Sequence, residues 1–494
     1  GLLARFDAGL PFQMTAGQRE VSQVILRDLQ SGHPMHRLLQ GEVGSGKTLV
    51  ALRAMLEVVD SGGQAALLAP TEVLAAQHFR TICELMGPLA TGGMLGGDGS
   101  GTQVALLTGS QTVGQRRAAL LKVVSGEAGI VVGTHAILQD KVQFADLGMI
   151  VVDEQHRFGV EQRAALSIKT QGDTRAHVLV MTATPIPRTV AMTVFGDLEV
   201  STLRELPAGR SPIQTHLVPA IDKPAFLSRT WDRVREEVEA GGQAYVVCPR
   251  IDQDPDEELE AALAQFLGVE EETAGDDQGA DAAVSAPLAS VEGTLAELTR
   301  GPLAGLRLAQ LTGRMSGEEK DTVMRRFAGD RDRPDAIDVL VATTVIEVGV
   351  DVPNATVMVV MDADRFGISQ LHQLRGRVGR GSKPGLCLLV TNAPAESPAR
   401  QRLEAVASTT DGFELSRLDL QARREGNVLG ATQAGRATSL RFLSLLRDED
   451  IIVAARSEAA TIVESDPLLV QHQALRRAAA ELVGEDGGQW LERT

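Results

Sequence analysis

The first part of the chain alternates short apolar runs with segments of helical periodicity. Apolar runs of this length, separated by helical stretches, are typical of strands that are buried on both faces of a parallel sheet. We predict strands at 36–40, 65–69, 104–107, 130–132, 149–152 and 177–181. The pattern therefore predicts a first α/β domain, which we place at residues 1–208.

A second alternating block follows a stretch rich in proline and glycine. Residues 205–214 have the composition of an interdomain linker. Beyond it, we predict strands at 243–248, 306–311, 339–342, 357–360 and 385–390. These runs predict a second α/β domain at residues 209–395, without a phosphate-binding loop of its own.

Two insertions and a helical tail complete the predicted organisation. Residues 92–101 are rich in glycine, and residues around 268–290 are acidic and rich in alanine and glycine. Their composition predicts mobile loops, and we expect the second to be disordered. Past about residue 395 the strand pattern stops, so arginine-rich helical patterns predict a mainly helical region at 396–494.

Residues Gly41–Thr48 match the phosphate-binding pattern G-x-x-x-x-G-K-[ST] at every position. A predicted strand precedes this loop and a predicted helix follows it, so its N–H groups and the positive end of the helix dipole face an anion. The lysine supplies a charge for the terminal phosphates, and the threonine hydroxyl supplies a magnesium ligand. A chance glycine-rich turn is the alternative, which this context disfavours. We assign nucleotide binding to Gly41, Gly44, Ser45, Gly46, Lys47 and Thr48.

Composition favours a globular protein and argues against a membrane-spanning or secreted one. An apolar content of 43% over 494 residues suits several globular domains, and the sequence has no apolar run long enough to cross a membrane. The start lacks the pattern of a secretory signal and an initiator methionine, which suggests a processed or truncated form. The three cysteines are far apart, which argues against a zinc ribbon and fits a reducing cytoplasm.

The net charge of −17 does not decide against nucleic acid. Residues 254–300 hold 13 acidic residues against Arg300, a charge of −12, so the rest of the chain carries −17 + 12 = −5. Basic residues cluster elsewhere, within 375–383 and 423–441. A basic face for phosphates is therefore compatible with the sequence.

An acidic motif and a threonine motif follow two predicted strands. Because Asp153 ends a strand, we predict that it is a magnesium ligand, and that Glu154 orients and deprotonates the attacking water. We expect Gln155 and His156 to sense the terminal phosphate. The hydroxyls of the motif that contains Thr182 and Thr184 would link hydrolysis to domain movement, although an ordinary proline-containing turn is the alternative.

An arginine motif at 373–380 lies in the predicted second domain. Arginines directed at the phosphates held by the first domain would make hydrolysis depend on closure of the cleft. We assign this role to Arg380, with Arg377 assisting, and include Gln373 in the catalytic set. A solvated basic helix end is the alternative.

Further stretches suit contacts with nucleic acid and with the base of the nucleotide. Hydroxyls and amides at helix N-termini fit a sugar–phosphate backbone without reading bases. We assign DNA contacts to Pro70, Thr71, Gln77, Gly133, Thr134 and His135. Upstream of the loop, Gln18 is predicted to read an adenine edge while Phe12 packs on the base.

Taken in order, these motifs resemble those of a superfamily 2 helicase. The strings at 153–163, 181–198 and 364–381 closely resemble the RecG family of bacterial branched-DNA translocases. The resemblance implies two tandem RecA-like parallel-sheet domains that clamp ATP and Mg²⁺, followed by a helical hairpin that couples hydrolysis to movement on duplex DNA. It places Gly349 and Asp351 at the nucleotide, and Arg423 and Gln433 in the coupling element.

The resemblance also implies partners and a location. The implied partners are double-stranded DNA, branched DNA such as forks and Holliday junctions, and the single-strand binding protein. The resemblance also implies a monomer that is located at the bacterial nucleoid. Two departures stand out. Arg424–Asn427 replaces a glycine-rich turn, which puts coupling efficiency in question. The family's N-terminal wedge domain has no counterpart ahead of the motor, so we expect poor unwinding of forks.

Three alternatives stay open at this point, and a fourth fails. The transcription-repair coupling factor shares the motor and the hairpin. An RNA or single-strand helicase is disfavoured by the hairpin after residue 411. A nucleotide-gated clamp is disfavoured, because it would not need the catalytic residues Lys47, Asp153, Glu154 and Arg380 that the chain carries. A small-molecule kinase fails, because the second domain and its arginine motif would have no role.

Overall fold

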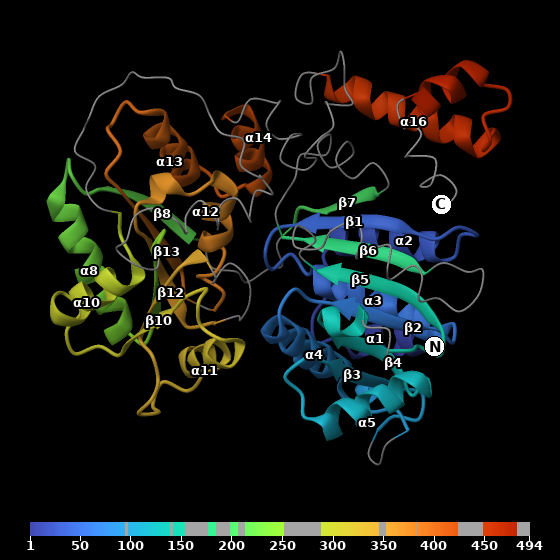
Figure 1. The fold of residues 1–494 in the computed structure, drawn as a ribbon, viewed down its shortest axis with the longest axis horizontal. Coiled ribbons are helices and arrows are strands. Elements are labelled where there is room, and N and C mark those ends of the chain that lie inside the picture. The colour runs from blue at the N-terminus through green and yellow to red at the C-terminus, as the bar shows by residue number, and fades with distance from the viewer. Residues whose placement is uncertain are drawn as a thin grey trace. The chain divides into compact units, whose positions relative to one another are not determined.

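The computed structural model describes residues 1–93, 97–138, 142–153, 176–183, 198–205, 213–250, 288–344, 352–381, 383–422 and 448–481. Within them the chain forms two compact units, and both parallel sheets lie in the first, which ends at Asp419. The two sheets are drawn with their helices in Figure 1. The second unit includes the C-terminal helix α16 (Glu449–Ser465).

The first sheet has seven parallel strands in the order β3-β4-β2-β5-β6-β1-β7 (Figure 1). Its strands are β1 (His36–Gly41), β2 (Gln64–Leu68), β3 (Gln103–Leu107), β4 (Ala128–Gly133), β5 (Leu147–Asp153), β6 (His177–Thr182) and β7 (Glu199–Leu203). Every residue of β2 and β4 is buried, as expected for central strands covered on both faces.

Helices cover both faces of this sheet. They are α1 (Leu2–Gly9), α2 (Ala16–Leu29), α3 (Lys47–Asp60), α4 (Glu72–Met86) and α5 (Val113–Val124), with the short 3-10 helices η1 (Gly87–Ala90) and η2 (His135–Leu138). The apolar sides of α1–α4 pack with Leu39 and Leu67 in one core cluster. A second cluster on the sheet holds Val123, Ile137 and Phe144. The sheet is therefore fixed from both sides, which gives its strand ends a defined position.

The second sheet has six parallel strands in the order β10-β11-β9-β12-β13-β8. Its strands are β8 (Ile213–Pro219), β9 (Gln243–Val247), β10 (Leu308–Leu311), β11 (Val339–Ala342), β12 (Ala355–Val360) and β13 (Gly385–Thr391). The expectation of two tandem parallel-sheet domains is thus confirmed.

The helices of the second domain also cover both faces. They are α8 (Pro224–Glu239), α10 (Val291–Arg300), α11 (Gly317–Ala328), η5 (Ala363–Arg365), α12 (Ile368–Arg375), α13 (Pro398–Ser408) and α14 (Gly412–Ala422). One cluster contains Trp231 of α8 and Leu298 of α10. The other contains Leu374 of α12, Leu403 of α13 and Leu415 of α14. The core of the second domain therefore extends past residue 395, where we placed its end; that boundary stays a prediction.

Two strands escaped the sequence analysis. β7 and β8 are both edge strands, and β8 alternates half-buried and exposed positions before its buried end. Polar residues interrupt the apolar run in both, as Glu199 does in β7 and Gln214 and His216 do in β8, whereas the other edge strands, β3 and β10, were predicted. β8 begins inside the stretch that we interpreted as a linker, whereas residues 206–212 lie outside the described residues.

The structure also bears on the two insertions, the cysteines and the expected lack of a membrane span. The acidic segment around 268–290 lies outside the described residues, and the described parts of the glycine-rich segment 92–101 flank the gap at 94–96. The three cysteines are free, with Cys248 and Cys387 buried. Among the helices of the described ranges, none combines the length and apolar character that a membrane crossing requires.

Candidate functional site

The predicted phosphate and metal residues meet at one edge of the first sheet. β5, β6 and β1 are neighbours, with Gln40 opposite Thr182 and Met181 opposite Asp153. The carboxyl ends of parallel strands share one edge of a sheet. The phosphate loop after β1, Thr182 and Asp153 therefore lie at the same level of this edge.

The backbone of the loop explains its glycines. Gly44 and Gly46 have positive φ values of 83° and 88°, in the region that glycine adopts without a steric penalty. At Gly41, a Cβ atom would lie 2.8 Å from the carbonyl oxygen of Leu203 and 2.8 Å from the hydroxyl of Ser45. All three glycines are thus set by the shape of the loop.

The polar groups of the loop fit a phosphate. Lys47 opens α3 and its Nζ donates to the carbonyl oxygens of Gly41 and Glu42, each at 2.9 Å. The Ser45 hydroxyl is fully buried in the loop and has no hydrogen-bond partner among the described residues. Thr48 lies in the first turn of α3, where a helix dipole favours anions. A cation, an unpaired hydroxyl and a helix start together can hold a phosphate with its metal ion.

Asp153 has a neighbour that the sequence analysis did not assign. Its Oδ2 lies 2.7 Å from Nε2 of His78 on α4, and both residues are 8% exposed. His78 shares the buried face of α4 with Ala75 and Ile82, spaced three and four residues away. A histidine on an otherwise apolar helix face is the signal that could have identified it. We infer that His78 orients the Asp153 carboxylate.

Thr182 is the last residue of β6 and is 4% exposed. Eight predicted site residues lie outside the described residues: Glu154, Gln155, His156, Thr184, Gly349, Asp351, Arg423 and Gln433.

The two residues predicted to contact the adenine base differ in their surroundings, because Gln18 is buried against the phosphate loop and Phe12 is exposed. Gln18 is 3% exposed; its Nε2 donates to the carbonyl oxygen of Ser45 at 2.8 Å, and its Oε1 accepts the N–H of Thr15. Phe12 is 49% exposed and lines a cavity of about 440 Å³ with Arg19 and Arg53. Gln18 is not among the residues that line this cavity. In this structure Gln18 supports the phosphate loop, whereas Phe12 faces a space large enough for a base.

All of the predicted DNA contacts except Gln77, which lies within α4, lie at or just after the carboxyl ends of β2 and β4 at the same edge of the sheet. Leu68 of β2 pairs with Gly133 of β4, and the N–H of Ala69 donates to the Gly133 carbonyl at 2.8 Å. Pro70 and Thr71 follow β2, and Thr134 follows β4. His135 is the first residue of η2 and Gln77 lies on α4.

The two hydroxyls of this group are used within the protein. Thr71 caps α4 by accepting the N–H of Leu74 at 3.3 Å. Thr134 is 1% exposed. The edge therefore offers backbone groups to a ligand more readily than it offers the Thr134 hydroxyl.

The arginine motif begins on α12 and continues past its end. Gln373 lies in the last turn of α12, half-buried, and Arg377 and Arg380 follow the helix. Nε of Arg380 donates to the carbonyl oxygen of Gly376 at 3.0 Å. Arg375 differs from the others: it is 2% exposed and bonded inside the domain. The cluster of cations that the sequence suggests thus includes one structural arginine.

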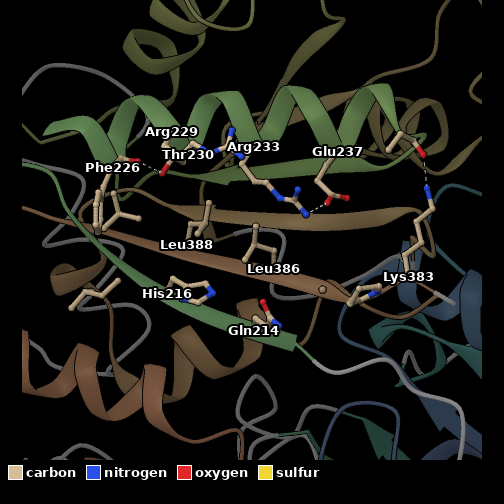
Figure 2. Close-up of a pocket in the computed structure, with 15 residues that line it drawn as sticks. Gln214, His216, Phe226, Arg229, Thr230, Arg233, Glu237, Lys383, Leu386 and Leu388 are labelled. Atoms are coloured by element: carbon tan, nitrogen blue, oxygen red, sulfur yellow. Dashed lines mark hydrogen bonds and ion pairs between the residues drawn. The ribbon is translucent and has the colours of Figure 1, made fainter. Parts of the chain in front are cut away.

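A larger cavity, of about 800 Å³, lies between α8 and the strands β8 and β13 (Figure 2). Its cations already have partners, because Arg229 pairs with Glu236, Arg233 pairs with Glu237, and Lys383 donates to the carbonyl of Ala240. Of the predicted site residues that the structure describes, none lines it. We do not assign it to nucleotide chemistry.

Three family models match successive parts of the chain. A DEAD/DEAH box helicase model matches residues 15–193, and a helicase conserved C-terminal domain matches residues 285–382. A model of ATP-dependent DNA helicase RecG, domain 3, C-terminal, matches residues 409–479. The third match begins three residues before α14.

Curated relatives cover nearly the whole chain. ATP-dependent DNA helicase RecG of Mycobacterium tuberculosis is 57% identical over 92% of this chain and 58% of its own length. RecG of Mycobacterium leprae is 52% identical over 100% of this chain and 63% of its own. RecG of Bacillus subtilis is 40% identical over 94% and 60%. The chain thus spans about three fifths of the length of these relatives.

Two solved structures are also similar to this chain. A RecG structure bound to a three-way DNA junction has a TM-score of 0.66 and 36% identity, covering 91% of this chain and 52% of that chain. Saccharomyces cerevisiae Dbp5 bound to RNA and ADP BeF3 has a TM-score of 0.52 at 16% identity, covering 87% and 97%. The second likeness shows the fold alone.

Proposed function

The chain belongs to the RecG family of ATP-dependent DNA helicases, and from this premise we propose that it is an ATP-driven translocase on double-stranded DNA. The observation that supports this most is the shared edge of the first sheet. There the phosphate loop, Asp153 and Thr182 lie side by side. A phosphate loop next to a buried carboxylate is the arrangement that NTP hydrolysis requires.

The residues divide the chemistry between the two domains. Lys47 and the loop N–H groups bind the phosphates, and Thr48 and Asp153 would hold Mg²⁺, which neutralises phosphate charge when bound. Glu154 would orient and deprotonate the water. The second domain would contribute Arg380, Arg377 and Gln373 to the transferring phosphate, and Gly349 and Asp351 to the nucleotide.

The nucleic-acid substrate is proposed from the relatives. A RecG structure is bound to a three-way junction, so we propose branched and duplex DNA as substrates, with remodelling of stalled forks and Holliday junctions as the activity. The edge that carries Pro70, Thr71, Gly133, Thr134 and His135, together with Gln77 of α4, would contact the backbone of the DNA. Coupling would run through Gln155, His156, Thr182 and Thr184 to Arg423 and Gln433.

Finer features also stand as proposals. We propose a monomer that acts at the bacterial nucleoid and has the single-strand binding protein as a partner. The transcription-repair coupling factor module is the alternative motor. The RecG-specific match at 409–479 favours the RecG type.

The test compares nucleic acids with the full chain. We expect a three-way junction or duplex to raise the ATPase rate more than single-stranded DNA or RNA of the same length. Stimulation by RNA alone would instead support an RNA helicase. Hydrolysis limited to a single turnover with DNA present would support a nucleotide-gated clamp.

Two variants assign the chemistry within that assay. Lys47→Ala should abolish ATP binding, because the loop loses its cation. Glu154→Gln should bind ATP and lower turnover about 10²- to 10⁴-fold, because general-base catalysis is lost. Normal steady-state turnover by Glu154→Gln would refute the general-base assignment.

A further inference from the structure

A carboxylate of the phosphate loop faces away from the loop. The side chain of Glu42 contacts residues of the second domain in the same compact unit. Its Oε2 lies 3.0 Å from Nε2 of His372 on α12, and its Oε1 accepts the N–H of Gly412 at 2.7 Å. Gly412 is the first residue of α14, where a negative charge is favourable for the helix dipole. One carboxylate thus holds both α12 and the start of α14.

The protonation of His372 follows from its second contact. Nδ1 of His372 lies 2.7 Å from Nη2 of Arg375. A guanidinium donates and cannot accept, so Nδ1 must be the acceptor and Nε2 must carry the proton that goes to Glu42. We therefore assign Nδ1 of His372 as the acceptor from Arg375 and Nε2–H as the donor to Glu42, so that the ring bridges a cation and an anion.

Arg375 extends the chain of contacts to α13. Its Nη1 donates to the carbonyl oxygens of Val406 at 2.9 Å and Thr409 at 2.7 Å, at the end of α13. A cation at a helix C-terminus satisfies carbonyls that have no partner within the helix. The short link between α13 and α14 is thus held by Arg375 at one end and by Glu42 at the other.

The charges of this network stabilise one another. Burial raises the pKa of Glu42, but hydrogen bonds from His372 and Gly412 and the nearby Arg375 charge outweigh it, so the pKa lies below its ordinary value. Burial lowers the pKa of Arg375. Glu42 is therefore an anion in the network at neutral pH.

One contact and one close approach of the backbone that do not involve Glu42 lie beside it. The guanidinium of Arg204, just after β7, lies over the ring of Phe413 at 5.6 Å. A Cβ atom at Gly376 would lie 3.5 Å from Cβ of Val43, the residue after Glu42. The first turn of α14 therefore meets the first domain at more than one side chain.

We propose that Glu42 is a positioning residue that links the phosphate loop to α14, which lies at the start of the RecG-specific region at 409–479. The inference rests on the proposed ATP-driven motor. Lys47 bonds the main-chain carbonyl of Glu42, and the Glu42 carboxylate bonds α14. A phosphate that engages Lys47 changes the bonding of that carbonyl, and the change reaches Gly412 through one residue.

The test measures hydrogen exchange of the 409–419 backbone in the full chain, with and without the non-hydrolysable analogue adenylyl imidodiphosphate. The variants are Glu42→Ala, Glu42→Gln and Glu42→Asp. Glu57→Gln serves as the control, because it makes the same change on the far end of α3, where Glu57 accepts a hydrogen bond from Gln30. ATPase rates with and without duplex DNA, and affinity for the analogue, are measured in parallel.

We expect Glu42→Ala to speed exchange of 409–419 about 5- to 50-fold and to remove its dependence on the analogue. Stimulation of the ATPase by DNA should fall by a similar factor, while affinity for the analogue changes less than about threefold. Glu42→Gln, which keeps an acceptor for Gly412, should lie between Glu42→Ala and the wild type. Glu57→Gln should match the wild type.

Three results would overturn the inference. The first is unchanged exchange at 409–419 in Glu42→Ala. The second is a loss of nucleotide affinity as large as the loss of rate, which would make Glu42 a residue of the loop fold alone. Glu42→Asp is the variant least prone to misfold, because it keeps the negative charge. Its side chain is shorter and should not reach both His372 and Gly412, so exchange at 409–419 equal to wild type in this variant is the third contradicting result. If the wild type fails to hydrolyse ATP, the motor proposal fails, whereas the exchange data still decide the Glu42 contact.

Discussion

Gly46 shows how one position in the phosphate loop is fixed from outside the loop. Its φ of +88° is unfavourable for any residue with a side chain. A Cβ atom there would lie 2.2 Å from Nε2 of Gln18, which donates to the carbonyl of Ser45. Gln18 itself is held by a capping box with Thr15 at the start of α2. The loop, the helix cap and the glycine therefore constrain one another.

We expect Gly46→Ala to weaken nucleotide binding by at least about tenfold, since left-handed backbone costs about 1–2 kcal/mol and the Gln18 bond is also displaced. Gly32→Ala is the matched control, because a Cβ at Gly32 meets no atom within 4 Å and its φ is not positive. Fluorescent-nucleotide titration measures the affinity. Equal affinities for the two variants would contradict this account of the loop.

At the scale of single elements, β11 is anchored at its start by an ion cluster around a buried carboxylate. Asp338, 5% exposed, accepts hydrogen bonds from Arg307 at 2.8 Å and 2.9 Å and from Arg331 at 3.1 Å. Burial raises the pKa of Asp338, but these bonds and the N–H of Arg307 outweigh it and lower the pKa to about 2. The cluster joins the starts of β10 and β11 at one end of the second sheet.

The depressed pKa sets the pH window. Because the folded state holds the carboxylate ionised, its contribution is complete above the ordinary value of 3.8 and is lost as the pH falls from about 4 to about 2. Asp338→Asn should destabilise the second domain by on the order of 1–2 kcal/mol at pH 7 and by less near pH 2. A loss that is the same at both pH values would refute the ionic explanation.

The loss of stability in Asp338→Asn is measured by urea unfolding followed by the fluorescence of Trp231, which is buried on α8 of the same domain. A Trp490→Phe background removes the signal of the other tryptophan. Asp335→Asn is the control, because Asp335 pairs at the surface with Arg326 and Arg333. Its effect should stay below about 0.5 kcal/mol.

At the scale of the whole molecule, hydrolysis is proposed to need a residue from each domain. The loop lies on the first sheet, and the arginine motif follows α12 of the second domain. An arginine that acts on the transition state raises the rate without adding much to ground-state binding.

Arg380→Ala should therefore lower the ATPase rate about 10³-fold while nucleotide affinity stays within about threefold. Lys383→Ala is the control, because Lys383 lies three residues away and donates to the carbonyl of Ala240 in its own domain. Steady-state rates and nucleotide titration separate the two effects. Equal losses of rate in both variants would point to a general charge effect.

The central strands and the phosphate loop were predictable because their signals are local. β2 and β4 are buried along their whole length, so their sequences are apolar throughout. The edge strands β7 and β8 were missed, since polar residues interrupt their apolar runs. His78 was missed for another reason: its partner Asp153 is 75 residues away.

The central strands, the phosphate loop and the family were readable from the amino-acid sequence alone, because each depends on residues that are neighbours in the chain. Tertiary structure decided which side chains meet. Gln18 supports the loop, Arg375 is buried in its own domain, and Glu42 contacts Gly412 across 370 residues. Such pairings arise from the order of strands in the sheets and from the packing of helices on them, and no local pattern records either.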